Sequence, residues 1–371
     1  MTTSFRSEAI QSDAPESPPF APVQSEPMPS KLLGQMYPFK FHGQAGEYFG
    51  IWIVNLLLTI ASLGLYAPWA KVRRLRYFYT NTEFVFRHFD FTGLPTKILM
   101  GRIIALSIAA FFVLAGYMEW GIAAFGGLIS YLAFPWLMTA TLKFNSRNSK
   151  FANSRFYFSG SSFQAYKQYF LGLLLVIFTL GLFAPVLIFF YKRFMIDHLY
   201  AGQLKFKLNN GWSDYVLAVY VPLIFYMSSV IVVAFLIGLI KAILQSSFND
   251  AYALGYYIGL IGFLGGILVL PFIKARIFIC TWNHISLGNS QFKTSCHTGR
   301  YAWILISNGL AKMLTVGLAT PWAAIRIYKY QIESLSLYLE DDPDQMMNIA
   351  QQDHNAIAEE LGDLFDFDIS L

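Results

Sequence analysis

Polar side chains inside the long apolar segments are the residues of this sequence best suited to chemistry. Asn55 and Asn308 each lie within such a segment, and Lys312 follows Asn308 by four residues. Residues four apart share one face of a helix, and polar groups within a bilayer are costly and often functional. Asn55, Asn308 and Lys312 are therefore the candidate intramembrane polar site, able to line a polar path. In the alternative interpretation, the asparagines hydrogen-bond neighbouring helices and Lys312 extends toward the headgroups.

Basic side chains form a second candidate site, a basic rim where the apolar segments end. Its members are Lys71, Arg73, Arg74, Arg76, Arg193 and Arg326. Such residues bind anionic lipid headgroups or anionic solutes, which is the functional interpretation. They also fix the cytoplasmic side of a membrane protein, which is the alternative.

The sequence shows no residue set for catalysis, for a cofactor or for a metal. It contains no Walker loop, no GxSxG and no HExxH motif. Cys296, His297 and His284 lack a fourth zinc ligand, and Cys280 and Cys296 form no CxxC pair. We expect no enzyme activity, no catalytic residue, no cofactor and no metal.

The amino-acid composition indicates that these residues lie in a membrane protein. Of the 371 residues, 56% are hydrophobic and only 13% are charged, whereas a soluble domain has about 25% charged residues. This composition argues against a cytosolic enzyme, a nucleic-acid-binding domain and a secreted disulfide scaffold. The expected partner is the lipid bilayer, with anionic headgroups against the basic face, and no nucleic acid.

Seven apolar stretches supply the helices that must position the candidate residues. They run over about 48–69, 98–118, 120–142, 168–191, 215–240, 252–280 and 301–322. A helix needs about 20 apolar residues to cross a bilayer. We therefore predict an all-α fold, a polytopic integral membrane helical bundle with internal pseudo-repeats and short surface strands.

Two motifs recur along the chain. The pattern L/V-G-L-x-x-P occurs three times, and its glycines and prolines predict helix breaks at Gly64, Pro68, Gly181, Pro185, Gly317 and Pro321. The pattern F-x-F-x-G occurs at 39–43, 89–93 and 156–160, with looser forms at 206–211 and 292–294. In four cases its first phenylalanine follows a proline by 21 residues. Alternation predicts a short strand, and these strands either pair with one another or serve only as interfacial anchors.

Hydropathy and charge along the sequence divide the chain into three predicted parts. Residues 1–38 are a disordered N-terminal tail, 39–339 a multi-pass membrane domain, and 340–371 an acidic C-terminal tail. The repeats cover about 39–88, 156–205 and 292–339, with helical hairpins 98–142 and 215–280 between them. The tail carries ten acidic residues, whereas 47–339 carry 24 basic and 8 acidic ones. It is expected to dock on the basic rim or on a protein partner, or to remain solvated.

The motif residues carry a family resemblance. The segment Gly46-Glu47-Tyr48-Phe49, continued by Leu63-Gly64-Leu65-Tyr66-Ala67-Pro68-Trp69 and the F-x-F-x-G at 89–93, resembles the YjgN-like family of bacterial inner-membrane proteins. The resemblance covers about 39–339. It implies a multi-pass protein of the bacterial inner (cytoplasmic) membrane, and it implies no reaction because the family has no known function.

Two topologies fit the charges. In one, all seven stretches cross the membrane. In the other, 98–142 and 215–280 form two crossing hairpins and the three L/V-G-L-x-x-P segments re-enter, which satisfies the positive-inside rule better. Broken helices in matching repeat positions point to a transport site. The leading expectation is transport of a small solute or lipid, and the alternative is a non-transporting membrane scaffold or interaction protein.

Overall fold

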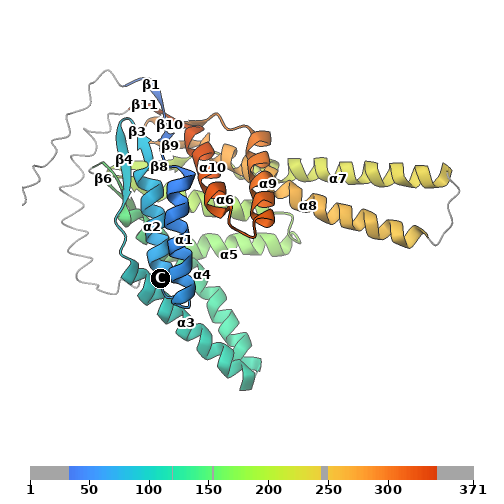
Figure 1. The fold of residues 1–371 in the computed structure, drawn as a ribbon, viewed down its shortest axis with the longest axis horizontal. Coiled ribbons are helices and arrows are strands. Elements are labelled where there is room, and N and C mark those ends of the chain that lie inside the picture. The colour runs from blue at the N-terminus through green and yellow to red at the C-terminus, as the bar shows by residue number, and fades with distance from the viewer. Residues whose placement is uncertain (1–32, 119, 153, 244–249, 341–371) are drawn as a thin grey trace, which may run out of the picture.

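The computed structural model describes residues 33–118, 120–152, 154–243 and 250–340, which form short strands and long helices (Figure 1). The strands within these ranges are β1 (Gln35–Pro38), β2 (Lys40–Phe41), β3 (Thr82–Phe84), β4 (Arg87–Phe91), β5 (Ser149–Phe151), β6 (Ser154–Phe158), β7 (Leu199–Ala201), β8 (Leu204–Leu208), β9 (Ile285–Leu287), β10 (Ser290–Thr294) and β11 (Leu335–Leu339). The helices are α1 (Ala45–Ala61), α2 (Ala67–Thr80), α3 (Pro95–Met118), α4 (Trp120–Asn148), α5 (Ser162–Phe178), α6 (Ala184–Asp197), α7 (Trp212–Ile243), α8 (Asp250–Trp282), α9 (Thr298–Leu314) and α10 (Thr320–Glu333).

The elements follow one order along the chain. Strand, helix, helix and strand succeed one another five times within the described ranges, from β2-α1-α2-β3 to β10-α9-α10-β11. We call each such group a unit. Every unit leaves the sheet through one helix and returns through the next, so each helical hairpin has both ends at the sheet.

The strands form one antiparallel sheet that is almost closed. In the described chain its order is β1-β11-β10-β9-β8-β7-β6-β5-β4-β3-β2. β1 and β2 lie at opposite ends of this order, although only Phe39 separates them in the sequence. The Phe39 amide also donates to the Leu335 carbonyl of β11 at 3.0 Å. The continuous segment β1–β2 therefore joins the two edges, and the sheet curves into a barrel.

The prediction of an all-α bundle with short surface strands is wrong. The core is an eleven-stranded sheet, counted over the described residues, from which the helical hairpins extend. The prediction missed the strand after each second helix because three-residue segments such as β3 and β7 are too short to show alternation. The F-x-F strands β4, β6, β8 and β10 lie in this sheet, but the prediction that they pair with one another is wrong, because each pairs with the strands that alternate with them.

The glycine of F-x-F-x-G has a steric cause. A Cβ on Gly93 or Gly160 would lie 2.5 Å from the ring of Phe91 or Phe158, the second phenylalanine of the same motif. That ring folds over the backbone where the strand ends and the next helix begins. Only glycine leaves room for it.

The three L/V-G-L-x-x-P segments form tight turns between the paired short helices α1–α2, α5–α6 and α9–α10. Leu63, Leu180 and Val316 adopt φ values of 50°, 50° and 49°. The glycine that follows each has a φ near +90°, at 91°, 90° and 89°. Pro68, Pro185 and Pro321 lie in the first turn of the second helix, where the missing N–H breaks no intrahelical hydrogen bond.

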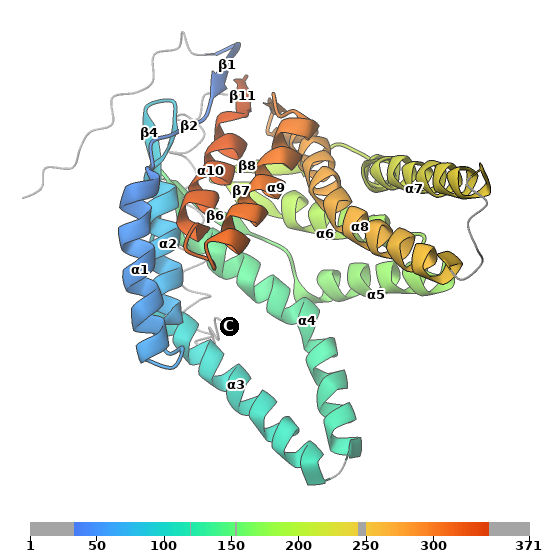
Figure 2. The same ribbon diagram turned by 45° about the vertical axis from the view of Figure 1, so that its right-hand side comes forward.

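The hairpins differ in length: α7–α8 extends well beyond α5–α6 in Figure 1, and α3–α4 extends well beyond α1–α2 in Figure 2. In the described part of the chain, three helical segments are long and apolar enough to cross a membrane: Ala124–Asn148, Trp212–Ile240 and Gly265–Trp282. The shorter α1 is also apolar. The sequence predicted seven apolar stretches with either seven crossings or two crossing hairpins and three re-entrant segments, and the number of crossings stays a prediction.

The structure changes one predicted boundary, the end of the N-terminal tail. Gln35–Pro38, assigned to the N-terminal tail, form strand β1 and pair with β11. The rest of the predicted N-terminal tail up to residue 32, and the acidic tail beyond residue 340, lie outside the described residues.

Candidate functional site

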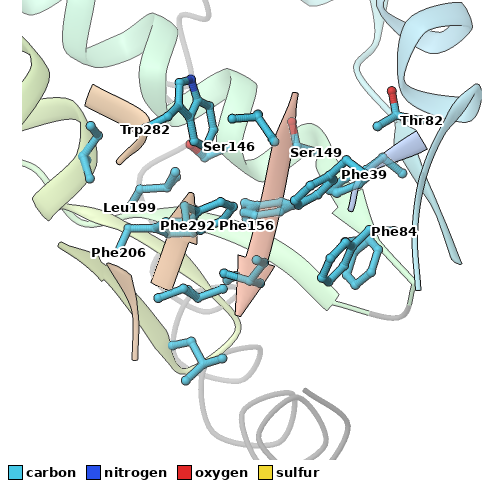
Figure 3. A pocket seen from close by; sticks show the side chains of 18 of the residues that line it. Phe39, Thr82, Phe84, Ser146, Ser149, Phe156, Leu199, Phe206, Trp282 and Phe292 are labelled. Carbon is cyan, nitrogen blue, oxygen red and sulfur yellow. The ribbon is translucent and has the colours of Figure 1, made fainter. Parts of the chain in front are cut away.

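The first phenylalanines of the five F-x-F positions form a ring inside the barrel. Phe39, Phe89, Phe156, Phe206 and Phe292 come from five different units, and neighbouring ring centroids lie 6.1–6.5 Å apart around a closed circuit. In all five neighbouring pairs the ring planes are within 30° of parallel. Figure 3 shows Phe39, Phe156, Phe206 and Phe292 across the interior. We call this set the phenylalanine ring; all five side chains line the barrel cavity.

A second set of interior residues alternates with the phenylalanine ring. Strand register places Phe151 opposite Phe89, Ala201 opposite Phe156, Leu287 opposite Phe206, and Leu337 opposite Phe292. Phe84 stacks on Phe39 at 4.3 Å. Together the ten residues make a continuous apolar layer, which we call the belt. Ala201 is the smallest side chain in the belt.

The belt surrounds a cavity of about 540 Å³ (Figure 3). This volume falls within the range of roughly 300–1,000 Å³ that small-molecule pockets occupy. The lining extends from the strands to the last turns of the second helices, where Tyr79, Ser146 and Tyr328 lie. The cavity therefore reaches the end of the barrel from which the hairpins leave.

One polar group at this end lacks a partner. The side-chain Oδ1 of Asn145 is buried and accepts no hydrogen bond from the described residues, and Asn145 lines the cavity. A buried acceptor without a donor costs about 1–3 kcal/mol. A ligand with a hydroxyl or amide hydrogen at that position would remove this cost.

The predicted intramembrane polar residues lie elsewhere. Asn308 is buried between α9 and α10, and its Nδ2 donates to the Ala323 carbonyl at 3.0 Å. Asn55 is buried in α1, whereas Lys312 is exposed near the end of α9. None of the three lines the barrel cavity. The contact made by Asn308 is the helix-to-helix hydrogen bond of the alternative interpretation.

The residues of the predicted basic rim are spread over three helices. Arg73 and Arg76 line an outer groove between α1 and α2, and Arg74 lies over the Phe78 ring. Arg193 pairs with Asp197 at 3.3 Å, and Arg326 donates to Ser307 at 2.7 Å. Lys71 is exposed on α2.

Two titratable groups of the first unit have shifted pKa values. Burial, opposed by the Gln44 backbone and reinforced by Glu47, raises the pKa of the Tyr77 hydroxyl to about 12. A hydrogen bond to His42, 2.5 Å long, lowers the pKa of the Glu83 carboxyl. No group of three or more His, Cys, Asp or Glu residues that could hold a metal occurs among the described residues.

Sequence reasoning missed the belt, although it found half of the signal. The F-x-F motif and its 21-residue spacing after proline were visible in the sequence. Which of the two phenylalanines lines the lumen was not, because residues two apart lie on the same face of a strand and the motif gives both positions the same side chain.

A sheet closed into a barrel, an apolar lumen and helical hairpins with exposed apolar surfaces define a membrane protein organised around a small β-barrel. The chain belongs to the family described as bacterial protein of unknown function (DUF898), whose profile matches residues 36–364.

Among curated proteins, it is similar to the inner membrane protein YjgN of Salmonella typhimurium. The two are 25% identical over 358 residues, which cover 83% of this chain and 90% of that protein. A shorter segment of 45 residues is 53% identical to the inner membrane protein YjgN of Escherichia coli K12, covering 12% of this chain and 11% of that protein. No solved structure matches the chain. These relatives support a location in the inner membrane.

Proposed function

We propose that this membrane protein binds the apolar chain of a membrane lipid in its barrel. The observation that carries the proposal is the continuous belt around a cavity of about 540 Å³. Cavities lined by apolar side chains stay dry and bind apolar molecules. The cavity extends toward the hairpins, the part of the protein with exposed apolar side chains, so we propose that a lipid chain enters from that end.

Lipid binding supports the expected role in transport of a lipid or small solute. A ring of phenylalanines across a lumen is a hydrophobic constriction that excludes water and ions, so we propose an apolar cargo rather than an ion. The belt offers no nucleophile and no acid–base pair, which favours binding over catalysis. In the alternative, the lipid is a fixed structural component of a non-transporting scaffold.

The five units support a common origin as internal repeats. Three of the hairpin turns have matching φ values, and the phenylalanine ring draws one residue from each unit. We propose that all five hairpins enter the membrane from the side on which the barrel lies, because each begins and ends in the sheet.

The test fills the cavity at its smallest side chain. Ala201→Phe introduces at this position the residue found at the matching positions 84 and 151. The variant should fold normally but retain much less lipid after purification, measured by mass spectrometry of extracted lipids. Gln203→Phe, which adds the same ring to an exposed position two residues away, is the control. Equal lipid retention in both variants would refute binding in the barrel.

Transport and scaffold roles are distinguished by reconstitution. Wild-type protein in liposomes should accelerate movement of a fluorescent phospholipid between leaflets, and Ala201→Phe should not. Lipid retention without movement would assign the scaffold role.

A further inference from the structure

An open groove runs between α1 and α2 on the outside of the molecule, with a volume of about 490 Å³. It is lined by Gly50, Ile51, Val54, Arg73, Arg76, Tyr77 and Thr80. The residues from α2 recur every three or four positions, so they share one helix face. Tyr79, which lines the barrel cavity, lies on another face of α2. The groove is thus separate from the barrel cavity.

The last unit shows how a matching arginine is satisfied inside the protein. In α9–α10, the Arg326 Nη1 donates to Ser307 Oγ at 2.7 Å and to Asn308 Oδ1 at 3.2 Å. The guanidinium also lies over the Trp322 ring at 5.0 Å. Both acceptors are on the neighbouring helix, so this arginine is held within its own hairpin.

The first unit lacks this arrangement. At the constant offset of 253 residues, Val54, Asn55 and Arg73 match Ser307, Asn308 and Arg326. Valine offers no acceptor, and the buried Asn55 Oδ1 has no hydrogen-bond partner among the described residues. Arg73 instead lies over the Tyr66 ring at 6.0 Å. Its charge therefore faces the groove without a carboxylate partner in the described part of the chain.

Arg76 adds a second positive charge to the groove. Its Nε donates to the Phe91 carbonyl at 3.1 Å, which anchors the side chain while leaving its two terminal nitrogens outside that bond. Glu47 accepts from the Tyr77 hydroxyl at 3.1 Å at the barrel end. Two guanidinium groups, one of them anchored, offer the planar paired donors that phosphate prefers.

The hairpin tip sets the depth of the groove. Leu63 is 94% exposed at the tip, and Leu65 is 57% exposed. With a helix rise of 1.5 Å per residue, Arg73 lies about 9 Å and Arg76 about 14 Å along the helix axis from Ala67, the first residue of α2. Half of a bilayer's hydrocarbon thickness is about 15 Å. A tip that reaches the bilayer centre would place Arg76 near the hydrocarbon boundary and Arg73 deeper, from where its long side chain extends toward the headgroups.

We propose that the α1–α2 groove binds the phosphate of an anionic phospholipid headgroup, with the hairpin tip among the acyl chains of the same leaflet. The site is independent of acyl-chain binding in the barrel, so either proposal can fail alone. It gives the basic rim one defined binding position in place of a diffuse charge effect.

The test uses the purified full chain in neutral detergent, titrated with short-chain phosphatidylglycerol and followed by native mass spectrometry. Arg73→Gln should weaken binding about tenfold, since a charged hydrogen bond is removed. Arg74→Gln removes the same charge from the same helix but outside the groove, and it should leave binding unchanged. Equal losses in the two variants would overturn the proposal, because they would indicate diffuse attraction.

A second variant keeps every charge. Val54→Ser supplies the acceptor that Ser307 provides in the last unit, so it should engage the Arg73 guanidinium within the hairpin and weaken phosphatidylglycerol binding. Because Val54 itself lines the groove, Val54→Ala, which removes the valine side chain without adding an acceptor, measures the effect of that loss alone. If Val54→Ser binds no more weakly than Val54→Ala, the proposed role of Arg73 is wrong.

A third titration identifies the source of the phosphate. Inorganic phosphate should displace the lipid only at far higher concentration, because it lacks the acyl chains that hold the lipid against the hairpin. Displacement at equal concentration would assign the groove to a soluble anion and overturn the lipid assignment.

Discussion

Exchange of side chains between units should reveal that the hairpins are equivalent. Asn55, Asn308 and Gly172 occupy matching positions in three first helices, and their facing positions in the second helices are Ala70, Ala323 and Leu187. Two hairpins pair asparagine with alanine, whereas α5–α6 pairs glycine with leucine. A Cβ on Gly172 would lie 2.5 Å from the Leu187 Cδ1. The large and small side chains have exchanged places.

The double variant Gly172→Asn with Leu187→Ala should therefore lose far less stability than the sum of the losses in the two single variants. Gly172→Asn alone overpacks the hairpin at a cost of about 2 kcal/mol. Leu187→Ala alone costs about 2 kcal/mol, at the low end for leucine because Leu187 is only half-buried. In the double variant the clash disappears, and the new asparagine side chain at position 172 gains a hydrogen bond worth about 1 kcal/mol. The model for this bond is the one that the Asn308 side chain donates to the Ala323 carbonyl. The double variant should unfold within about 1 kcal/mol of wild type, a coupling near 3 kcal/mol.

The assay is reversible unfolding of the full chain in mixed detergent micelles, followed by tryptophan fluorescence. Gly309→Asn is the control, because nothing lies within 4 Å of a Cβ at Gly309, and it should change stability by less than about 1 kcal/mol. Additive losses in the double variant would refute the equivalence of the hairpins and, with it, the argument that matches Arg73 to Arg326.

Further predictions concern the barrel and its orientation. Gly160→Ala should destabilise the protein by about 1–3 kcal/mol, because the added Cβ meets the Phe158 ring. Gly46→Ala is the control, since nothing lies within 4 Å of a Cβ at that position. Equal Tm values for the two variants would contradict the steric reason. The lowered pKa of the Glu83 carboxyl stabilises the fold above its ordinary value of 4.5, and this contribution is lost as pH falls through the folded-state pKa. Glu83→Gln should therefore be less stable than wild type at neutral pH and approach it below pH 4.5; a difference in Tm that does not depend on pH would contradict the role of the ionised carboxylate. Single cysteines at the exposed positions Phe86 and Gln203, with both native cysteines replaced, should react with an impermeant thiol reagent from the same side of the membrane; labelling from opposite sides would indicate that the intervening chain crosses an odd number of times.

The candidate site was only partly readable from the sequence. The F-x-F motif marked the strands that carry the phenylalanine ring, but Asn145 and Ala201 carry no local signal. Ala201 matters only because its strand places it opposite Phe156. The polar residues chosen from the sequence were selected because polarity is conspicuous in an apolar segment, whereas the cavity is defined by apolar side chains that are common throughout this chain.

Composition and local pattern are sufficient to indicate the membrane character, the helix breaks and the strands of the F-x-F motif. These depend on composition and on local geometry: proline and glycine end helices, and alternation over five residues makes a strand. Only the tertiary structure decided that these strands close into a barrel. Closure depends on β1 and β2 reaching partners at Leu335–Leu339 and Thr82–Phe84, which are far apart along the chain. Pairing at that separation leaves no periodic trace in a single sequence, because the partner strands are only three to five residues long.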